Sequence, residues 1–178
     1  IVTIAKEAGK AIMQVYKQDF EVEYKKDSSP LTLADKKAND IIEDGLNKLP
    51  VNFPILSEEG KEIPYGDRKH WEYFWLVDPL DGTKEFVKKN DEFTVNIALI
   101  HKDTPVLGVV YAPALDVCYW AKKGEGAFKD GQKLPLKTIA PRNTYKIVIS
   151  RSHMSDETQE FIDAIDTSKE KELVLIGS

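Results

Sequence analysis

Several residue types and patterns are scarce in this chain of 178 residues, and each scarcity narrows the class of protein. Cys118 is the single cysteine, so no disulfide can form within the chain, and a reducing compartment such as the cytoplasm is expected. No apolar run approaches the ~20 residues of a transmembrane helix, and the first residues do not form a signal peptide. His70, His101 and His153 lack the spacing of zinc ligands.

Positive charge is also in deficit, because 25 Lys and Arg stand against 30 Asp and Glu, giving a net charge of −5. Such a chain offers little basic surface to displace counterions, so a nucleic-acid polymer is not an expected partner. If an acidic protein handles a small phosphorylated molecule, repulsion between negative charges must be overcome. Hard divalent cations choose oxygen ligands, so carboxylates that hold such a cation would provide the compensation. The sequence carries no signal for an oligomeric state.

Hydrophobic periodicity predicts a chain of mixed helices and strands. Helices are expected at 2–17, 34–49 and 155–165, and strands at 20–24, 54–57, 73–77, 93–100, 105–112, 117–121, 147–150 and 173–176. The strands between 93 and 121 are predicted to be consecutive and antiparallel, and 60–72 is predicted to be a polar, mobile loop.

The strand–helix–strand pattern after Ile147 predicts a second domain. We therefore expect an N-terminal metal-binding, catalytic α+β domain at 1–146 and the beginning of a C-terminal α/β domain at 147–178. The absence of an initiator Met and the end at Gly177–Ser178 suggest a longer natural chain.

A candidate metal site follows the apolar strand 73–77, in the string Asp78-Pro-Leu80-Asp81-Gly-Thr. Proline stiffens the backbone, so a rigid turn would let both carboxylates and the Leu80 carbonyl face one point. That arrangement is an oxygen cage suited to Mg²⁺. Asp-Pro and Asp-Gly are each common turn dipeptides, and only the full string after an apolar strand favours the metal site.

Glu58 and Glu59 follow the strand 54–57. If that strand lies beside 73–77, Glu58 reaches the same site, whereas the alternative is an exposed pair in a solvated loop. A helix that begins at Gly82-Thr83 would offer free N–H groups to a phosphate, although Thr83 as a plain N-cap is the simpler interpretation.

Asp35 stands three residues after Thr32, which is the spacing of a helix capping box, and capping is the default interpretation. The functional alternative pairs Asp35 with the Thr83 hydroxyl, because a weakly acidic hydroxyl needs a neighbouring base to relay a proton. Gly124-x-Gly126 lacks the lysine and the strand–loop–helix context of a phosphate loop, so we interpret it as a hairpin turn.

Three strings together resemble the inositol monophosphatase superfamily of Mg²⁺-dependent, lithium-sensitive phosphatases: Leu-Ser-Glu-Glu at 56–59, Trp-Leu-Val-Asp-Pro-Leu-Asp-Gly-Thr at 75–83 and Gly-Glu-Gly-Ala-Phe at 124–128. Lys-Glu-Phe at 84–86, with the segments 28–35, 93–100 and 150–153, resembles the bacterial 3'(2'),5'-bisphosphate nucleotidases within it. The resemblance implies an α/β fold, an alternating α/β/α/β/α sandwich.

The resemblance also implies roles for individual residues. Two or more Mg²⁺ ions would be held by Glu58, Asp78, the Leu80 carbonyl and Asp81. Asp35 and Thr83 would form a proton relay, and Glu59 would orient water. The residues expected to contact the substrate are Glu58, Leu80, Asp81, Gly82, Thr83 and His153.

The implied reaction converts adenosine 3',5'-bisphosphate to AMP and phosphate by in-line attack of metal-activated water, without a phosphoenzyme. The sulfated nucleotide PAPS is a further candidate substrate, and the activity would serve sulfate assimilation. One alternative is an inositol monophosphatase or other sugar phosphatase. A second is a haloacid-dehalogenase-type phosphatase, whose nucleophile lies in an Asp-x-Asp string. A third is a non-catalytic metal-binding fragment, because the superfamily's later Trp-Asp motif is not found after Ile147.

Overall fold

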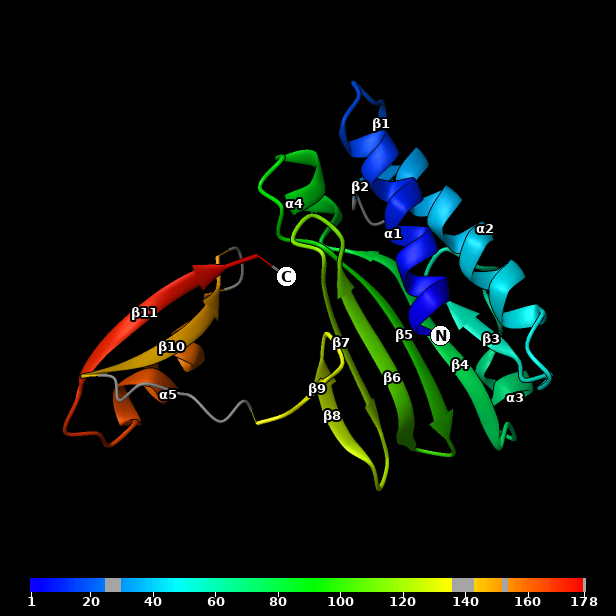
Figure 1. The fold of residues 1–178 in the computed structure, drawn as a ribbon. Helices are drawn as coiled ribbons and strands as arrows, with labels where there is room; N and C mark the ends of the chain where they lie inside the picture. Colours follow the sequence, from blue (N-terminus) through cyan, green and yellow to red (C-terminus); the bar gives the residue numbers. More distant parts are fainter. Residues whose placement is uncertain (25–29, 136–142, 152–153, 178) are drawn as a thin grey trace. The chain divides into compact units, whose positions relative to one another are not determined.

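The computed structural model describes residues 1–24, 30–135, 143–151 and 154–177 (Figure 1). The chain forms two compact units, Ile1–Pro135 and Leu136–Ser178. The domain boundary predicted after residue 146 stays a prediction. Among the described helices, none is both long enough and apolar enough to cross a lipid bilayer.

A seven-stranded mixed sheet forms the frame of the first unit (Figure 1). Its strands, in spatial order, are β3 (Ile55–Ser57), β4 (Tyr73–Asp81), β5 (Thr94–His101), β6 (Thr104–Ala112), β7 (Val117–Lys122), β8 (Gly126–Lys129) and β9 (Gln132–Lys133). β3 runs parallel to β4, and the pairs from β4 to β9 are antiparallel. The consecutive antiparallel strands and the hairpin turn between β7 and β8 are therefore confirmed.

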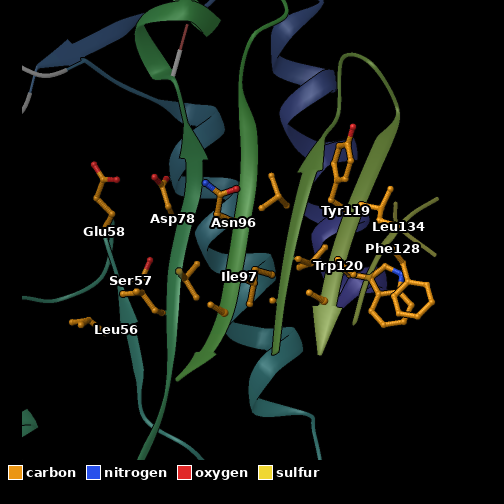
Figure 2. A pocket seen from close by; sticks show the side chains of 18 of the residues that line it. Leu56, Ser57, Glu58, Asp78, Asn96, Ile97, Tyr119, Trp120, Phe128 and Leu134 are labelled. Carbon is orange, nitrogen blue, oxygen red and sulfur yellow. The ribbon is translucent and has the colours of Figure 1, made fainter. Parts of the chain in front are cut away.

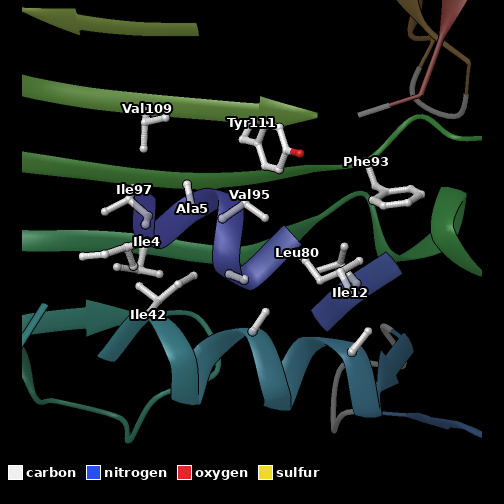
Figure 3. Packing of buried hydrophobic residues seen from close by; sticks show 14 of the residues in the cluster. Ile4, Ala5, Ile12, Ile42, Leu80, Phe93, Val95, Ile97, Val109 and Tyr111 are labelled. Atoms are coloured by element: carbon white, nitrogen blue, oxygen red, sulfur yellow. The ribbon is translucent and has the colours of Figure 1, made fainter. Parts of the chain in front are cut away.

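Two helices, α1 (Val2–Tyr16) and α2 (Leu33–Asn47), pack on one face of this sheet (Figure 3). Their apolar residues recur at helical spacing, and Ile12 and Ile42 are fully buried. They meet alternate residues of the strands, such as Val95 and Ile97, because successive side chains of a strand point to opposite faces. Each such buried aliphatic side chain contributes roughly 1.5–3 kcal/mol through the hydrophobic effect. This core supports the strands from the side opposite to the acids.

Three shorter elements complete the first unit. The strands β1 (Val22–Tyr24) and β2 (Pro30–Thr32) form an antiparallel pair just before α2. The segment 60–72 was predicted as a loop, but it contains a one-turn helix, α3 (Tyr65–Arg68), which begins after Pro64. Four residues are too few to produce a helical hydrophobic period, so the sequence pattern missed it. The helix α4 (Thr83–Val87) follows β4 directly.

The end of β4 differs from the rigid turn that was predicted. The strand continues through Asp78 to Asp81, with a shift of register between these two residues. Asp78 pairs with Asn96 and Asp81 with Thr94, so Pro79 and Leu80 stand opposite a single residue of β5. This is a β-bulge, which accommodates a proline because the extra residue leaves the ladder of hydrogen bonds.

The second unit is a parallel strand–helix–strand motif. It consists of β10 (Thr144–Ser150), α5 (Asp156–Ala164) and β11 (Glu170–Ile176), and the two strands pair in parallel register. Ser155 caps α5 by accepting a hydrogen bond from the Thr158 N–H at 3.3 Å. These elements agree with the predicted helix and strands after residue 147.

Candidate active site

Glu58 and Asp78 lie side by side because β3 and β4 are parallel neighbours in the sheet. Ser57 pairs with Val77, and the next residue, Glu58, donates its backbone N–H to the Val77 carbonyl at 3.1 Å. Both strands therefore deliver their acids to the same edge of the sheet. Figure 2 shows the Glu58 and Asp78 side chains at one end of a cavity. The prediction that Glu58 reaches the Asp78 site is confirmed.

The bulge in β4 brings Asp81 to the same face as Asp78. In a regular strand, residues three apart point to opposite faces. Here their ladder partners, Asn96 and Thr94, are two residues apart and so share a face, which puts both acids on one side. The amide of Asn96 donates to Asp81 Oδ2 at 3.2 Å, in agreement with this placement.

Leu80 is one of the two residues of the bulge, and its backbone groups contact Asp78 and Thr83. Its N–H donates to Asp78 Oδ1 at 3.2 Å, and its carbonyl accepts from the Thr83 hydroxyl at 3.2 Å. Its side chain is 2% exposed and belongs to the core. The Leu80 carbonyl therefore points toward Thr83, and its role as a metal ligand stays a prediction.

Burial, together with the negative charges of Glu58 and Asp81, raises the pKa of Asp78 from 3.8 to about 7. A hydrogen bond with the Glu58 side chain acts in the same direction, whereas the Leu80 N–H opposes it. Without a cation, Asp78 is therefore only partly ionised near neutral pH and still holds a proton in part of the molecules. A divalent cation bound here would replace that proton as the compensating charge.

No three His, Cys, Asp or Glu side chains come together closely enough to hold an ion by themselves in residues 1–24, 30–135, 143–151 and 154–177. Instead, Asp78 interacts electrostatically with Glu58 from the neighbouring strand and with Asp81 from its own strand. This donor set fits Mg²⁺, which is usually held by one or two carboxylates and completes its octahedron with water and substrate phosphate oxygens.

Asp35 and Thr83 meet although they are far apart in the sequence. The Thr83 hydroxyl donates to Asp35 Oδ1 at 3.1 Å. Asp35 Oδ2 accepts from the Thr32 N–H at 2.7 Å and from the Thr32 hydroxyl at 2.6 Å, and Thr32 caps α2. Burial raises the pKa of Asp35, and the hydrogen bonds from Thr32 and Thr83 act against this rise. Capping and contact with Thr83, weighed as alternatives, therefore coexist in one carboxylate.

Gly82, not Thr83, is the N-cap of α4, so the interpretation of Thr83 as a plain cap is wrong. Gly82 has φ +90°, and a Cβ atom there would lie 2.9 Å from the Glu92 carbonyl oxygen. The N–H groups of Glu85 and Phe86 both donate to the Gly82 carbonyl, which leaves those of the preceding residues outside the helix ladder.

A cavity of about 730 Å³ opens on the sheet face opposite α1 and α2, with the acids at one end (Figure 2). Its polar end carries Glu58, Asp78 and Asn96, and the rest is formed mainly by apolar residues of neighbouring strands, including Leu76 and Val110. The cavity is therefore divided into a charged edge and an apolar floor.

Comparison with known proteins adds to this geometry. The model of the inositol monophosphatase family matches residues 1–178. The chain belongs to the inositol monophosphatase family. Within it, the chain is 48% identical over 179 residues to the 3'(2'),5'-bisphosphate nucleotidase CysQ of Salmonella typhimurium, covering 98% of this chain and 70% of that protein.

Solved members of the family share the fold. The crystal structure of CysQ from Bacteroides thetaiotaomicron matches with a TM-score of 0.83 and 39% identity, over 98% of this chain and 70% of that one. An IMPase/NADP phosphatase complexed with Mg²⁺ and phosphate matches with a TM-score of 0.75 and 24% identity, over 97% of this chain and 64% of that one. The predicted layered α/β fold of the family is confirmed.

Two further residues were singled out by the family resemblance, and their roles stay predictions. Glu59 is half-buried in the turn after β3, and it is not among the described residues that line the cavity. His153 lies outside the described residues. Conversely, sequence reasoning missed Asn96. The signal for it was a polar residue between Val95 and Ile97, which interrupts an apolar strand at the position that pairs with Asp78.

Proposed function

We propose that this chain is a Mg²⁺-dependent 3'(2'),5'-bisphosphate nucleotidase that hydrolyses adenosine 3',5'-bisphosphate to AMP and phosphate. The observation that carries the proposal is the meeting of Glu58, Asp78 and Asp81 at one sheet edge, next to the hydrogen-bonded pair Thr83–Asp35. The similarity to CysQ nucleotidases over nearly the whole chain supports the choice of substrate.

Oxygen donors at this edge suit two or more Mg²⁺ ions. We assign one ion to Glu58, Asp78 and the Leu80 carbonyl, and a second to Asp78 and Asp81. The raised pKa of Asp78 supports the assignment, because it reflects the burial of this carboxyl beside the negative charges of Glu58 and Asp81. When bound, Mg²⁺ would supply positive charge opposite the phosphoryl oxygens and favour ionisation of water.

Thr83 and Asp35 move the proton in this proposal. The Thr83 hydroxyl has one hydrogen and two acceptors within reach, Asp35 Oδ1 and the Leu80 carbonyl. When the hydrogen is directed to Asp35, an oxygen lone pair of Thr83 is free to accept a proton from water. As that proton arrives, Thr83 passes its own to Asp35, whose Oδ2 stays fixed by Thr32. The water oxygen forms a bond to phosphorus while the bond from phosphorus to the ribose 3'-oxygen breaks, and the leaving oxygen takes a proton from solvent.

The remaining assignments concern the phosphate, the water and the cell. The backbone from Leu80 to Thr83 would line the scissile phosphate, because the N–H groups before Glu85 lie outside the helix ladder. Glu59 would orient water, and His153 would contact the nucleotide. We further propose a cytoplasmic role in sulfate assimilation, activity on PAPS and inhibition by lithium.

The rival enzyme of the haloacid-dehalogenase type fits this site less well. Its Asp-x-Asp string would place both acids on one face of a regular strand, because residues two apart share a face. Here the acids are three apart and need the bulge to share a face. The family match likewise supports the metal-dependent phosphatase over a covalent mechanism.

A phosphate-release screen tests the proposal. Adenosine 3',5'-bisphosphate, inositol monophosphate and fructose 1,6-bisphosphate are each incubated with the chain, with Mg²⁺ and with a chelator. We expect fastest release from the nucleotide and no release with the chelator. Faster release from inositol monophosphate would favour the sugar-phosphatase alternative. Bound Mg²⁺ without release from any substrate would favour the non-catalytic fragment.

A further inference from the structure

Asn96 is a polar side chain in a strand whose neighbouring positions serve the core. Val95 and Ile97 are fully buried against the helices, whereas Asn96 points to the cavity beside Asp78 (Figure 2). It is the ladder partner of Asp78, at the point where the bulge begins. A hydrophobic residue would pack well on this apolar floor. The hydrogen bonds of the Asn96 amide indicate why a polar residue stands here instead.

The contacts of Asn96 fix the amide in one orientation. Its Nδ2 donates to Asp81 Oδ2 at 3.2 Å, and its Oδ1 accepts from the Thr94 hydroxyl at 3.0 Å. In the flipped orientation the amide oxygen would face the carboxylate oxygen, and two acceptors would repel each other. The Thr94 hydroxyl stabilises the orientation in which a donor faces Asp81, and Thr94 is itself the ladder partner of Asp81.

The amide gives Asp81 a defined orientation without adding charge. It holds Oδ2 through a donated hydrogen bond. A lysine or arginine at this position would also hold the carboxylate, but its positive charge would compete with a cation. The neutral amide leaves the negative charge of Asp81 available to a metal ion.

We propose that Asn96 is a positioning residue for the metal site, which orients Asp81 through the relay Thr94–Asn96–Asp81. The inference rests on the proposed function, because it assigns Asp81 to a bound cation. Groups that orient metal-ligating carboxylates typically change metal affinity or activity by about 10- to 100-fold when they are removed. The bulge makes such support necessary, because it releases the backbone near Asp81 from the regular ladder.

Binding of Mn²⁺ to the whole chain, measured by electron paramagnetic resonance of the free ion, tests the inference. Mn²⁺ is a suitable probe because it shares the preference of Mg²⁺ for oxygen ligands. Asn96→Leu keeps the shape of the side chain and removes the donor, so we expect about tenfold weaker binding of Mn²⁺. Thr94→Val keeps the donor but frees the amide to flip, so its effect should be smaller and in the same direction.

Kinetics separate positioning from catalysis. With Asn96→Leu, the Mg²⁺ concentration for half-maximal phosphate release should rise, and kcat should recover at saturating Mg²⁺. The matched control is Thr104→Val, which removes a hydroxyl that contacts Asp103 at the start of β6, away from the acids. Thermal melts without metal verify that all variants are folded at the temperature of the assay.

Three outcomes are distinguishable. Weaker Mn²⁺ binding by Asn96→Leu, with intermediate binding by Thr94→Val, supports the orientation of Asp81 by Asn96 and Thr94. Equal Mn²⁺ affinity of wild type and Asn96→Leu overturns it and leaves the proposed function intact. Absence of Mn²⁺ binding by the wild-type chain overturns the metal assignment itself, and the positioning role with it.

Discussion

Two carboxyl groups of the first unit, Asp35 and Asp78, both have a raised pKa, but their surroundings differ. Asp35 is 1% exposed and accepts hydrogen bonds from Thr32 and Thr83, so the protein itself satisfies its oxygens. Asp78 is half-buried beside two other acids, one of them Glu58. The first carboxyl is complete without a ligand, and the second is short of positive charge.

This difference indicates a division of labour. Asp35 is held in one position by its hydrogen-bond donors, and a residue that accepts a proton from Thr83 needs such a fixed position. Acids that raise one another's pKa through burial and repulsion are costly to the fold, and they are typical of sites where a ligand or a reaction uses them. The following predictions test that contrast, beginning with the largest effect.

Asp78→Asn should reduce Mg²⁺-dependent phosphate release by at least about 10³-fold, because several kcal/mol of charge stabilisation depend on the bound cation. In the absence of metal, the same substitution should raise the melting temperature at pH 8, since it removes one of three mutually repelling charges. Phosphate release and thermal melts measure the two effects. Asp103→Asn, at an exposed acid before β6, is the matched control. Unchanged turnover by Asp78→Asn would remove the site assignment.

Thr83→Val should lower kcat by about 10²- to 10⁴-fold and leave Mn²⁺ affinity close to that of the wild type, because it removes the hydroxyl of the relay and no metal ligand. Thr83→Ser keeps the hydroxyl and should retain most of the activity. Steady-state kinetics with both variants, together with Mn²⁺ titration, make the comparison. A parallel loss of activity and Mn²⁺ affinity in Thr83→Val would mean that Thr83 belongs to the metal site.

Stability should depend on pH in a way that Mg²⁺ reverses. The pKa of Asp78 is about 7 in the folded chain, whereas an unperturbed aspartate, as in the unfolded chain, has a pKa of 3.8. The folded state therefore binds this proton more tightly than the unfolded state does. Without metal, the contribution of Asp78 to stability is therefore greatest below pH 4 and is lost as the pH rises to 7. Mg²⁺ competes with the proton, so the rise in melting temperature on adding Mg²⁺ should be larger at pH 8 than at pH 6. An equal rise at both pH values would contradict the competition between Mg²⁺ and the proton on Asp78.

The smallest effect concerns the other carboxyl. Thr32→Ala removes the cap of α2 and the hydroxyl donor to Asp35. We expect a loss of about 1 kcal/mol in the free energy of unfolding, or roughly 2–4 °C in melting temperature. Mn²⁺ affinity should be unchanged, because Asp35 and the acid cluster are separate. Thr32→Ser, which keeps the cap, should behave like the wild type in the same melts.

The sequence predicted the elements well where hydrophobic periodicity was strong. The apolar spacing of α1 and the runs that became β5 to β7 were sufficient, because these segments bury one face against a common core. The meeting of Glu58 with Asp78 followed from two acids at the ends of adjacent strands, once β3 and β4 proved to be parallel.

The bulge in β4 and the role of Asn96 could not be predicted in the same way. Pro79 in the string suggested a turn, because proline ends most strands, and a proline accommodated by a bulge looks identical in sequence. Asn96 becomes meaningful only through its register with Asp78, and register is set by long-range pairing that local patterns do not contain.

The extra residue in β4 determines what kind of natural variation this edge can accept. Replacing Leu80 by another residue alters a side chain in the core but keeps its N–H and carbonyl, which contact Asp78 and Thr83. Deleting one residue there would leave both acids on the same side of a now regular strand, yet without that peptide group between them. The number of positions separating the two aspartates is therefore under stricter constraint than the identity of the residues that fill them.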